Sequence, residues 1–322
     1  MLRLQTALVA AVFLIGAGTA QAQQTWPLKP VRLIVANAAG AAVDTGARIV
    51  ASALSASFGQ AVTVENRPGA EGYLAAQAVA RADSDGYTLF FASQSIFAID
   101  PHIKKNFPFD LERDFTPIAV LVDDTGPVGL FAHPSMPFTT LQEMVSYHRA
   151  NPGKLSIAIS VPQFSMLSSW IDKRAGIETL QVPYKSAAQA VQDIVAGRVS
   201  LFLTNFGFFE RYVKAGKVRP LLVTRPAEGW SQIPTLASIF PDFTYQTFFA
   251  LVGPGGMPRE LVLQMNRAVA AVVEDPKFNQ SLTKIRWRNL KGARTPEGTA
   301  DFQARTRAQW GQFIRDIGLE PR

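Results

Sequence analysis

Short apolar runs alternate with amphipathic segments along most of the chain. Between the runs, apolar positions recur every three to four residues, as in the segment 49–58 that stops at Gly59, and this spacing predicts helices. Strands that alternate with helices are typical of parallel sheets with helices on their faces. Ten runs rich in β-branched or aromatic residues predict strands at residues 31–35, 62–65, 88–91, 118–122, 128–132, 155–159, 179–182, 199–204, 218–224 and 249–252.

Boundary signals fix the starts of several of these helices. Thr140 followed by Glu143 is a capping box, and Ser186 is a cap candidate for the helix that ends before Gly197. Thr295 precedes a proline at the first helical position of a last amphipathic segment. These signals predict helices that begin near residues 141, 187 and 296.

Proline and glycine cluster at positions where the chain can pass between two lobes. The clusters include Gly126-Pro127 and residues 226–229. We therefore predict a discontinuous first lobe, residues 23–124 plus 228–322, with residues 125–227 inserted as the second lobe. Two crossings form a hinge, so the lobes can close on a small molecule.

The first 22 residues have the layout of a cleavable secretory signal. Arg3 precedes an apolar run over residues 7–17, and Ala20-Gln21-Ala22 provides a cleavage site. Removing 22 residues from 322 leaves 300, which is enough for two lobes. The chain has no cysteine, so we expect it to tolerate an oxidising compartment without disulfides and to carry no lipoprotein anchor.

A formal charge of +7 favours anionic partners. Outside the inner membrane, a small anionic solute or an acidic protein surface is a more economical partner than nucleic acid. Residues 284–294 carry five cations and Trp287 without an acidic residue. A solvated strand or loop accounts for this segment, and a docking surface for a membrane partner is the alternative.

Catalytic and metal-binding templates are absent from the sequence. No nucleophile elbow, Walker loop, dinucleotide fingerprint or zinc-protease motif is present, and His102, His133 and His148 are far apart. A hydrolase using Ser160 or Ser165 lacks a suitably placed histidine. We expect no catalytic residue, no metal and no cofactor.

Two loops between a strand and a helix are candidates for binding an anion. Residues 36–44 are mostly small, so a ligand can approach the backbone N–H groups at the positive end of the following helix. A plain turn with Asp44 as the helix cap explains the same residues. Residues 160–165 form a similar loop in the second lobe, and together the two loops would hold one carboxylate from both sides.

Several motifs resemble the periplasmic solute-binding proteins of tripartite tricarboxylate transporters, the Bug receptors. The resemblance covers nearly the whole chain after the signal. It implies a type II periplasmic-binding-protein fold, with two lobes that each hold a mainly parallel sheet, no catalysis, and capture of carboxylates for a membrane permease. It also implies binding through backbone N–H groups and bridging waters of the loops at 36–44 and 160–165. The motifs are residues 29–35, 64–70, 85–89, 114–117, 182–188, 215–219 and 253–258.

The chain departs from the family pattern in these same loops. Alanines occupy much of a first loop that is usually rich in proline and glycine, and the second loop keeps only Ser165 of a Gly-Asn-Gly-Thr-Ser pattern. Pro162 removes a donor and Phe164 adds apolar bulk. These departures predict a monocarboxylate or dicarboxylate with an aromatic or otherwise apolar body.

The predicted protein is a monomeric periplasmic receptor that serves a permease of the tripartite tricarboxylate type. A receptor that reports its ligand to a signalling partner is the alternative. Aromatic residues are dense near the expected site, but most of them belong to the core. The candidate ligand-binding residues are Ala38, Ala39, Gly40, Ala41, Ala42, Asp44, Gln94, Ser95, Ser160, Gln163, Phe164, Ser165, Tyr184, Asn205, Phe206 and Phe248.

Overall fold

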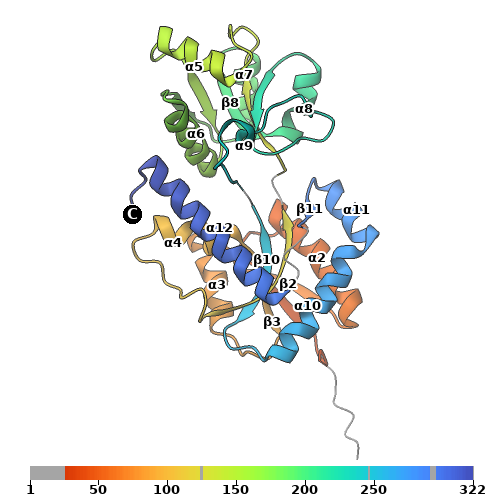
Figure 1. Cartoon of the computed structure of the whole chain (residues 1–322). Coiled ribbons are helices and arrows are strands. Elements are labelled where there is room, and N and C mark those ends of the chain that lie inside the picture. Colours follow the sequence, from red (N-terminus) through yellow and green to blue (C-terminus); the bar gives the residue numbers. More distant parts are fainter. Residues whose placement is uncertain (1–25, 124–125, 246, 291–294, 322) are drawn as a thin grey trace, which may run out of the picture.

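Two β-sheets, each with its own helices, divide the chain into two parts (Figure 1). The computed structural model describes residues 26–321 apart from 124–125, 246 and 291–294. The six-stranded sheet with its helices is called lobe 1 below, and the five-stranded sheet with its helices is called lobe 2. The predicted signal peptide, residues 1–22, lies outside the described residues.

Lobe 1 is built on a mixed sheet in the order β11-β4-β10-β3-β1-β2. β1 pairs in parallel with β2 and β3, whereas β10 runs antiparallel to β3 and β4, and β11 runs antiparallel to β4. Its strands are β1 (Val31–Val35), β2 (Val62–Asn66), β3 (Thr88–Ser93), β4 (Phe115–Asp123), β10 (Phe249–Pro254) and β11 (Arg288–Asn289).

Helices cover both faces of this sheet. Leu33 and Val35 join the core on one face, while Ile34 joins the core on the other. Burial on both faces explains why β1 is apolar at every position but Arg32 instead of alternating. The helical elements are α2 (Ala42–Phe58), η1 (Ala70–Gly72), α3 (Tyr73–Ala80), η2 (Ser95–Ile99), α4 (Asp100–Ile103), α10 (Arg259–Glu274), α11 (Pro276–Lys284) and α12 (Pro296–Ile317).

Lobe 2 is built on a sheet in the order β7-β6-β8-β5-β9. β6 is parallel to β7 and β8, and β5 is antiparallel to β8 and β9. The predicted caps form, since Thr140 and Ser186 accept hydrogen bonds from the first turns of α5 and α7. Its elements are β5 (Val128–Ala132), α5 (Leu141–Ala150), β6 (Ser156–Ile159), α6 (Pro162–Ala175), β7 (Leu180–Pro183), α7 (Ala187–Val195), β8 (Leu201–Asn205), α8 (Phe206–Lys214), β9 (Arg219–Val223) and α9 (Leu236–Ile239).

The predicted α/β class with two mainly parallel sheets is confirmed. In each sheet four strands run in one direction. β5 and β10 run against them because each begins at the edge where the chain enters from the other lobe. The ten predicted strands correspond to β1 through β10, and β11 is an additional short strand.

The return from lobe 2 to lobe 1 comes later than residues 227/228. Trp230 packs edge-on against Phe206 with ring centroids 5.6 Å apart, and Phe243 lies 4.8 Å from Trp170 of α6. Residues 228–243 therefore pack with lobe 2, because their aromatic rings find apolar partners there, and the predicted boundary is placed too early. The other predicted boundary, 124/125, lies outside the described residues.

Candidate functional site

The carboxyl ends of the parallel strands in both lobes lie beside the segments that cross between the lobes. In lobe 1, Phe249 at the start of β10 pairs with Ser93 of β3 and with Val122 of β4. In lobe 2, Val128 at the start of β5 pairs with Asn205 at the end of β8. Because β4 ends at Asp123 and β5 begins at Val128, these two strand ends lie within about 18 Å of each other. The space between the two edges is the candidate site.

The loop between β1 and α2, residues 36–41, leaves backbone donors free at the start of the helix. Ala41 precedes α2 and makes no side-chain cap. The N–H groups of Ala42, Val43 and Asp44 have no acceptor among the described residues. Free N–H groups at the positive end of a helix favour an anion.

The tip of this loop is open to solvent. Ala38, Ala39 and Gly40 are exposed, and the Ala41 N–H closes a tight turn by donating to Ala38 O at 3.2 Å. Gly40 has a φ of 82°, a left-handed conformation that favours glycine. The short side chains leave the backbone accessible to a ligand.

Asp44 holds this loop in place from within. Its carboxylate is only 2% exposed and accepts hydrogen bonds from Gly40 N–H (2.9 Å), Arg48 Nε (2.9 Å) and the Asn66 amide (2.8 Å). The Arg48 hydrogen bond is the largest of the causes that lower the pKa of Asp44 to about 2. The Asp44 side chain is thus not the helix cap, and its oxygens are bonded within lobe 1, whereas its backbone N–H stays free.

The matching loop of lobe 2 connects β6 to α6. Val161 precedes α6 and makes no side-chain cap, and Gln163 is half-buried. Ser165, predicted as a ligand donor, instead donates to Gln181 Oε1 at 2.5 Å, and the Gln181 amide donates to Ser169 Oγ at 3.0 Å. Ser165 therefore ties α6 to β7, as Asp44 ties α2 to β2.

Three predicted residues combine burial with unpaired polar atoms at the two edges. Gln94 Oε1 follows β3, Ser160 Oγ follows β6, and Asn205 Oδ1 ends β8, and each is a buried atom without a hydrogen-bond partner. Gln94 is 6% exposed, and Ser95 beside it is half-buried. Leaving such an atom unpaired costs about 1–3 kcal/mol, so these three atoms at strand ends of the two lobes are candidates for completion by a ligand.

Asn205 shows this most clearly. It precedes α8 as the cap residue, yet its side chain makes no cap hydrogen bond. An asparagine at this position ordinarily accepts from the first turn of its own helix. Here both the side-chain oxygen and the start of α8 remain available at the edge that faces lobe 1.

The aromatic side chains predicted for the site are buried. Phe164, Phe206 and Phe248 are 4%, 3% and 1% exposed and belong to the cores, because rings beside a sheet edge pack under the helices that follow it. The Tyr184 hydroxyl donates to Asp193 at 2.7 Å, and burial is the first cause that raises the pKa of Tyr184 to about 12. Contact of these four side chains with a ligand stays a prediction.

Sequence analysis missed one exposed aromatic residue near this edge. Phe208, in the first turn of α8, is 41% exposed. The spacing gives the signal, because Phe206 and Phe209 are three residues apart and share the buried face of the helix, whereas Phe208 lies off that face.

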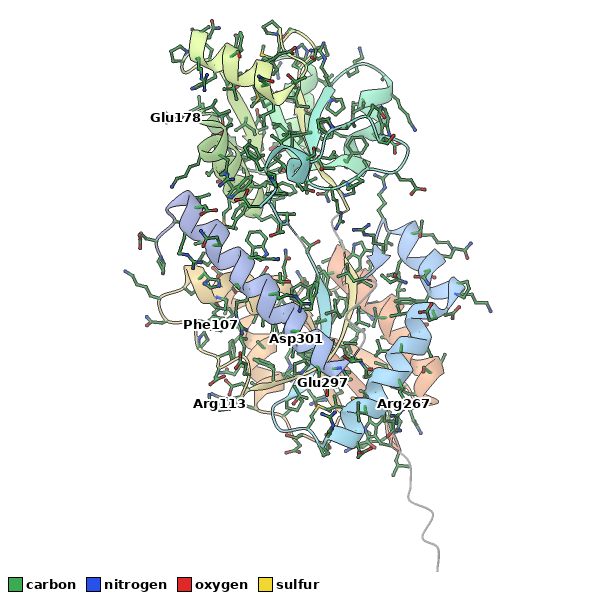
Figure 2. The ribbon with its side chains drawn as sticks, viewed as in Figure 1. Phe107, Arg113, Glu178, Arg267, Glu297 and Asp301 are labelled. Atoms are coloured by element: carbon green, nitrogen blue, oxygen red, sulfur yellow. The ribbon has the colours of Figure 1, made fainter. Side chains whose placement is uncertain are left out.

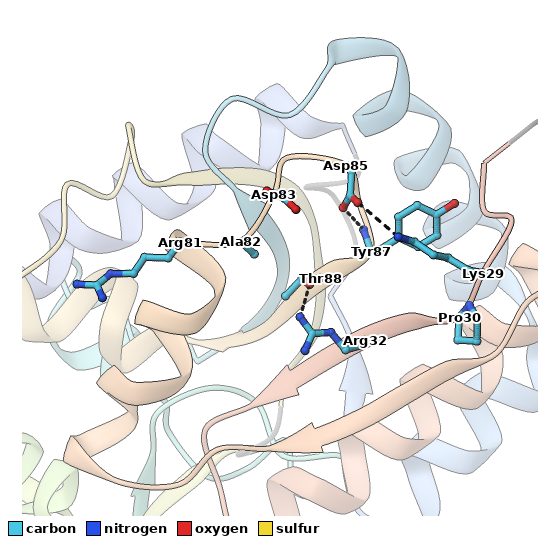
Figure 3. A pocket seen from close by; sticks show the side chains of 9 residues that line it. All are labelled: Lys29, Pro30, Arg32, Arg81, Ala82, Asp83, Asp85, Tyr87 and Thr88. Atoms are coloured by element: carbon cyan, nitrogen blue, oxygen red, sulfur yellow. Dashed lines mark hydrogen bonds and ion pairs between the residues drawn. The ribbon is translucent and has the colours of Figure 1, made fainter.

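A hollow of about 410 Å³ lies at the opposite edge of the lobe 1 sheet (Figure 3). It is lined by residues at the amino ends of β1 and β3, and some of its polar groups bond to one another. Lys29 Nζ lies 3.8 Å from Asp85 and 4.3 Å from the Tyr87 ring centroid, and Arg32 donates to Thr88 Oγ1 at 2.8 Å. Asp83 lines the hollow without an ion pair among the described residues, and the hollow lies at the end of β1 opposite to residues 36–41.

Two further properties bear on function. Across the described ranges, no three His, Asp or Glu side chains gather as a metal-binding group. No helix in the same ranges has both the length and the apolar character to cross a bilayer.

The family described as tripartite tricarboxylate transporter family receptor matches residues 46–319. A relative from Bordetella bronchiseptica, a protein of the UPF0065 group, is 30% identical over 325 residues, which cover 98% of this chain and 94% of the relative. An R. palustris protein solved with adipate superposes with a TM-score of 0.71 at 29% identity and covers 92% of this chain and 100% of its own. The periplasmic binding protein BugD superposes with a TM-score of 0.69 at 26% identity, with 92% and 100% covered.

Proposed function

This chain belongs to the tripartite tricarboxylate transporter family of receptors, and from that premise we propose that it captures a small carboxylate-bearing solute between its two lobes. The observation that carries the proposal is that the carboxyl edges of both sheets hold groups without hydrogen-bond partners. Lobe 1 offers the N–H groups of Ala42, Val43 and Asp44 together with Gln94, and lobe 2 offers Asn205.

These groups define what a ligand must carry. A carboxylate suits the free N–H groups at the start of α2, where the helix dipole is positive. The Gln94, Ser160 and Asn205 side chains are neutral, so the remainder of the ligand should offer neutral hydrogen-bonding groups. Phe164, Phe206 and Phe248 are buried in the cores, so the exposed ring of Phe208 is the aromatic group that supports an aromatic or apolar body of the ligand.

The proposed location and partner of the protein are those expected for its family. We place the protein in the periplasm, delivered there by the predicted leader at residues 1–22, and delivering its solute as a monomer to a permease of the tripartite tricarboxylate type. The neighbour solved with adipate makes linear dicarboxylates the first probes to use. In this proposal the protein catalyses no reaction and holds no cofactor.

The test is to block the α2 donors without disturbing the fold. Ala41 has the extended backbone of a helix cap, with φ −69° and ψ 160°, so the side chain in Ala41→Asp can accept the free N–H groups of the first turn. The new carboxylate should abolish binding of adipate or of the best ligand in a panel of mono- and dicarboxylates. The helix itself should be preserved, because aspartate at a cap position is favourable.

Matched variants separate charge from donor blockage. Ala41→Asn blocks the same donors without a charge, and Ser52→Asp adds the same charge at an exposed position of the same helix. Isothermal titration should show lost binding in both Ala41 variants and wild-type binding in Ser52→Asp. Wild-type affinity in Ala41→Asp would overturn the placement of the carboxylate, and no binding of any carboxylate by the wild-type protein would overturn the function.

A further inference from the structure

One charged side chain of lobe 1 crosses to lobe 2. Arg286 lies between α11 and β11, and its Nη1 donates to the Gly207 carbonyl oxygen in the first turn of α8. The two residues are 79 positions apart in the chain. Gly207 comes two residues after Asn205, so the contact lies at the lobe 2 edge of the candidate site.

The backbone that carries Arg286 is firmly held. Arg286 has a φ of 62°, a left-handed conformation that non-glycine residues rarely adopt. Its N–H donates to Thr283 O, and the next residue, Trp287, is 6% exposed and stacks on Phe249 at 5.3 Å. The Trp287 ring also occupies the space that a side chain at Gly46 of α2 would need. A strained residue kept in place by such packing points to a role for its side chain.

Gly207, whose carbonyl oxygen accepts this hydrogen bond, allows Arg286 to approach closely. A Cβ at Gly207 would meet Arg286 Nη1 at 3.2 Å, so glycine leaves room for the guanidinium. Glu210, one turn further along α8, supplies a negative charge that already pairs with Lys214 at 2.8 Å. The positive charge of Arg286 is among the causes that lower the pKa of Glu210, after hydrogen bonds from Lys214 and Trp230.

The lobes also touch on the other side of the crossing. Trp170 of α6 stacks on Phe313 of α12 with ring centroids 5.6 Å apart and an interplanar angle of 5°. Figure 1 shows α12 on the α6 side and the α11–β11 segment on the α8 side. An apolar stack thus joins the lobes on one side, and the Arg286 hydrogen bond joins them on the other.

We propose that Arg286 is a positioning residue that fixes the start of α8, and with it Asn205, relative to lobe 1. It thereby sets the spacing of the two edges from which a ligand is bound. The effect on ligand affinity rests on the proposed function, whereas the effect on lobe spacing does not.

The test measures lobe spacing without ligand. The chain has no cysteine, so two introduced cysteines can be spin-labelled specifically. Glu178→Cys in lobe 2 and Arg267→Cys on α10 place the labels on exposed positions of the two lobes (Figure 2). The distance distribution between the labels is then recorded by pulsed electron spin resonance.

Three substitutions are compared in this labelled background. Arg286→Ala and Arg286→Gly both remove the contact, and Arg286→Gly also suits the positive φ, so a shared effect cannot come from backbone strain. Lys284→Ala removes an exposed charge from the last turn of α11 and serves as the control. Both Arg286 variants should broaden and shift the distribution, and Lys284→Ala should match the wild type. A wild-type distribution in Arg286→Gly would overturn the proposal.

Ligand binding provides the second measurement. Adipate, or the best ligand of the panel, should bind the Arg286 variants with an affinity changed by on the order of fivefold, because spacing and binding are coupled. Unchanged spacing refutes the role of Arg286 whatever the ligand. Absence of any ligand for the wild-type protein refutes the proposed function and leaves the distance measurement decisive for Arg286.

Discussion

Asp44→Asn tests whether the carboxylate of Asp44 holds the first binding loop in place. The side chain of Asp44 is 3% exposed and accepts hydrogen bonds from the Gly40 backbone, Arg48 and Asn66. An amide of the same shape has one acceptor in place of two, so its NH₂ group faces a donor. The substitution should loosen the loop and lower the free energy of unfolding.

The pKa of Asp44 sets the size of this effect. A fall from 3.8 to about 2 corresponds to about 2 kcal/mol of stabilisation by the ionised form. Arg48, the leading cause, is 53% exposed, and solvent screening reduces the contribution to about 1–2 kcal/mol. Because the folded pKa is the lower one, this stability is present above pH 4 and is lost as the pH falls through 2. By pH 3 about half of it remains.

Urea unfolding followed by tryptophan fluorescence measures the effect at pH 7 and pH 3. Asp44→Asn should be less stable than the wild type at pH 7, and the difference should shrink by about half at pH 3. Asp83→Asn, at an exposed carboxylate with no ion pair among the described residues, is the control and should change little. An equal difference at both pH values, or none at pH 7, would refute the assignment of Asp44 as the ionised brace of the loop.

Two further substitutions test groups at or near the lobe 1 edge. Gln94→Leu should weaken binding of adipate or the best ligand about tenfold in calorimetry without lowering the melting temperature, because it replaces a buried amide whose oxygen has no partner. Gln77→Leu, at an exposed position of α3, is the control. Full affinity in Gln94→Leu would remove Gln94 from the site. Burial is the first cause that raises the pKa of Asp100 to about 6, so Asp100→Asn should stabilise the protein by up to about 3 kcal/mol at pH 8. The gain should fall to about 0.5 kcal/mol at pH 4 and disappear near pH 3, where the carboxyl is protonated in both the folded and the unfolded wild type. A loss of stability at pH 8 would show that the charge is compensated.

Strand positions could be predicted from the sequence because these strands are buried on both faces. β1 is the clearest case, since Leu33 and Ile34 point to different cores and are both fully buried. A continuous apolar run between turn residues carries that information locally. The ends of β1 and β5 were predicted to the residue for the same reason.

The second crossing could not be placed in this way. Residues 226–229 do form a turn, and a turn rich in proline and glycine looks the same whether or not the chain leaves the lobe after it. The position of the crossing depends on which residues Trp230 contacts, and these are Phe206 and Glu210 of α8. Such contacts between distant segments leave no local signal.

The same distinction between local and distant contacts separates the features of the predicted site that the sequence can supply from those that depend on the fold. Free backbone donors at the start of α2 follow from secondary structure alone, and a βα loop of small residues suffices to predict them. The availability of a side chain depends on its partners: Ser165 is bonded to Gln181 and Tyr184 to Asp193, whereas Asn205 meets none. In the proposed function, the preference for carboxylates comes from backbone N–H groups, which can be predicted from the sequence. Selectivity among carboxylates comes, in the same proposal, from the few side chains that the fold leaves unpaired, and only the structure distinguishes these from their bonded neighbours.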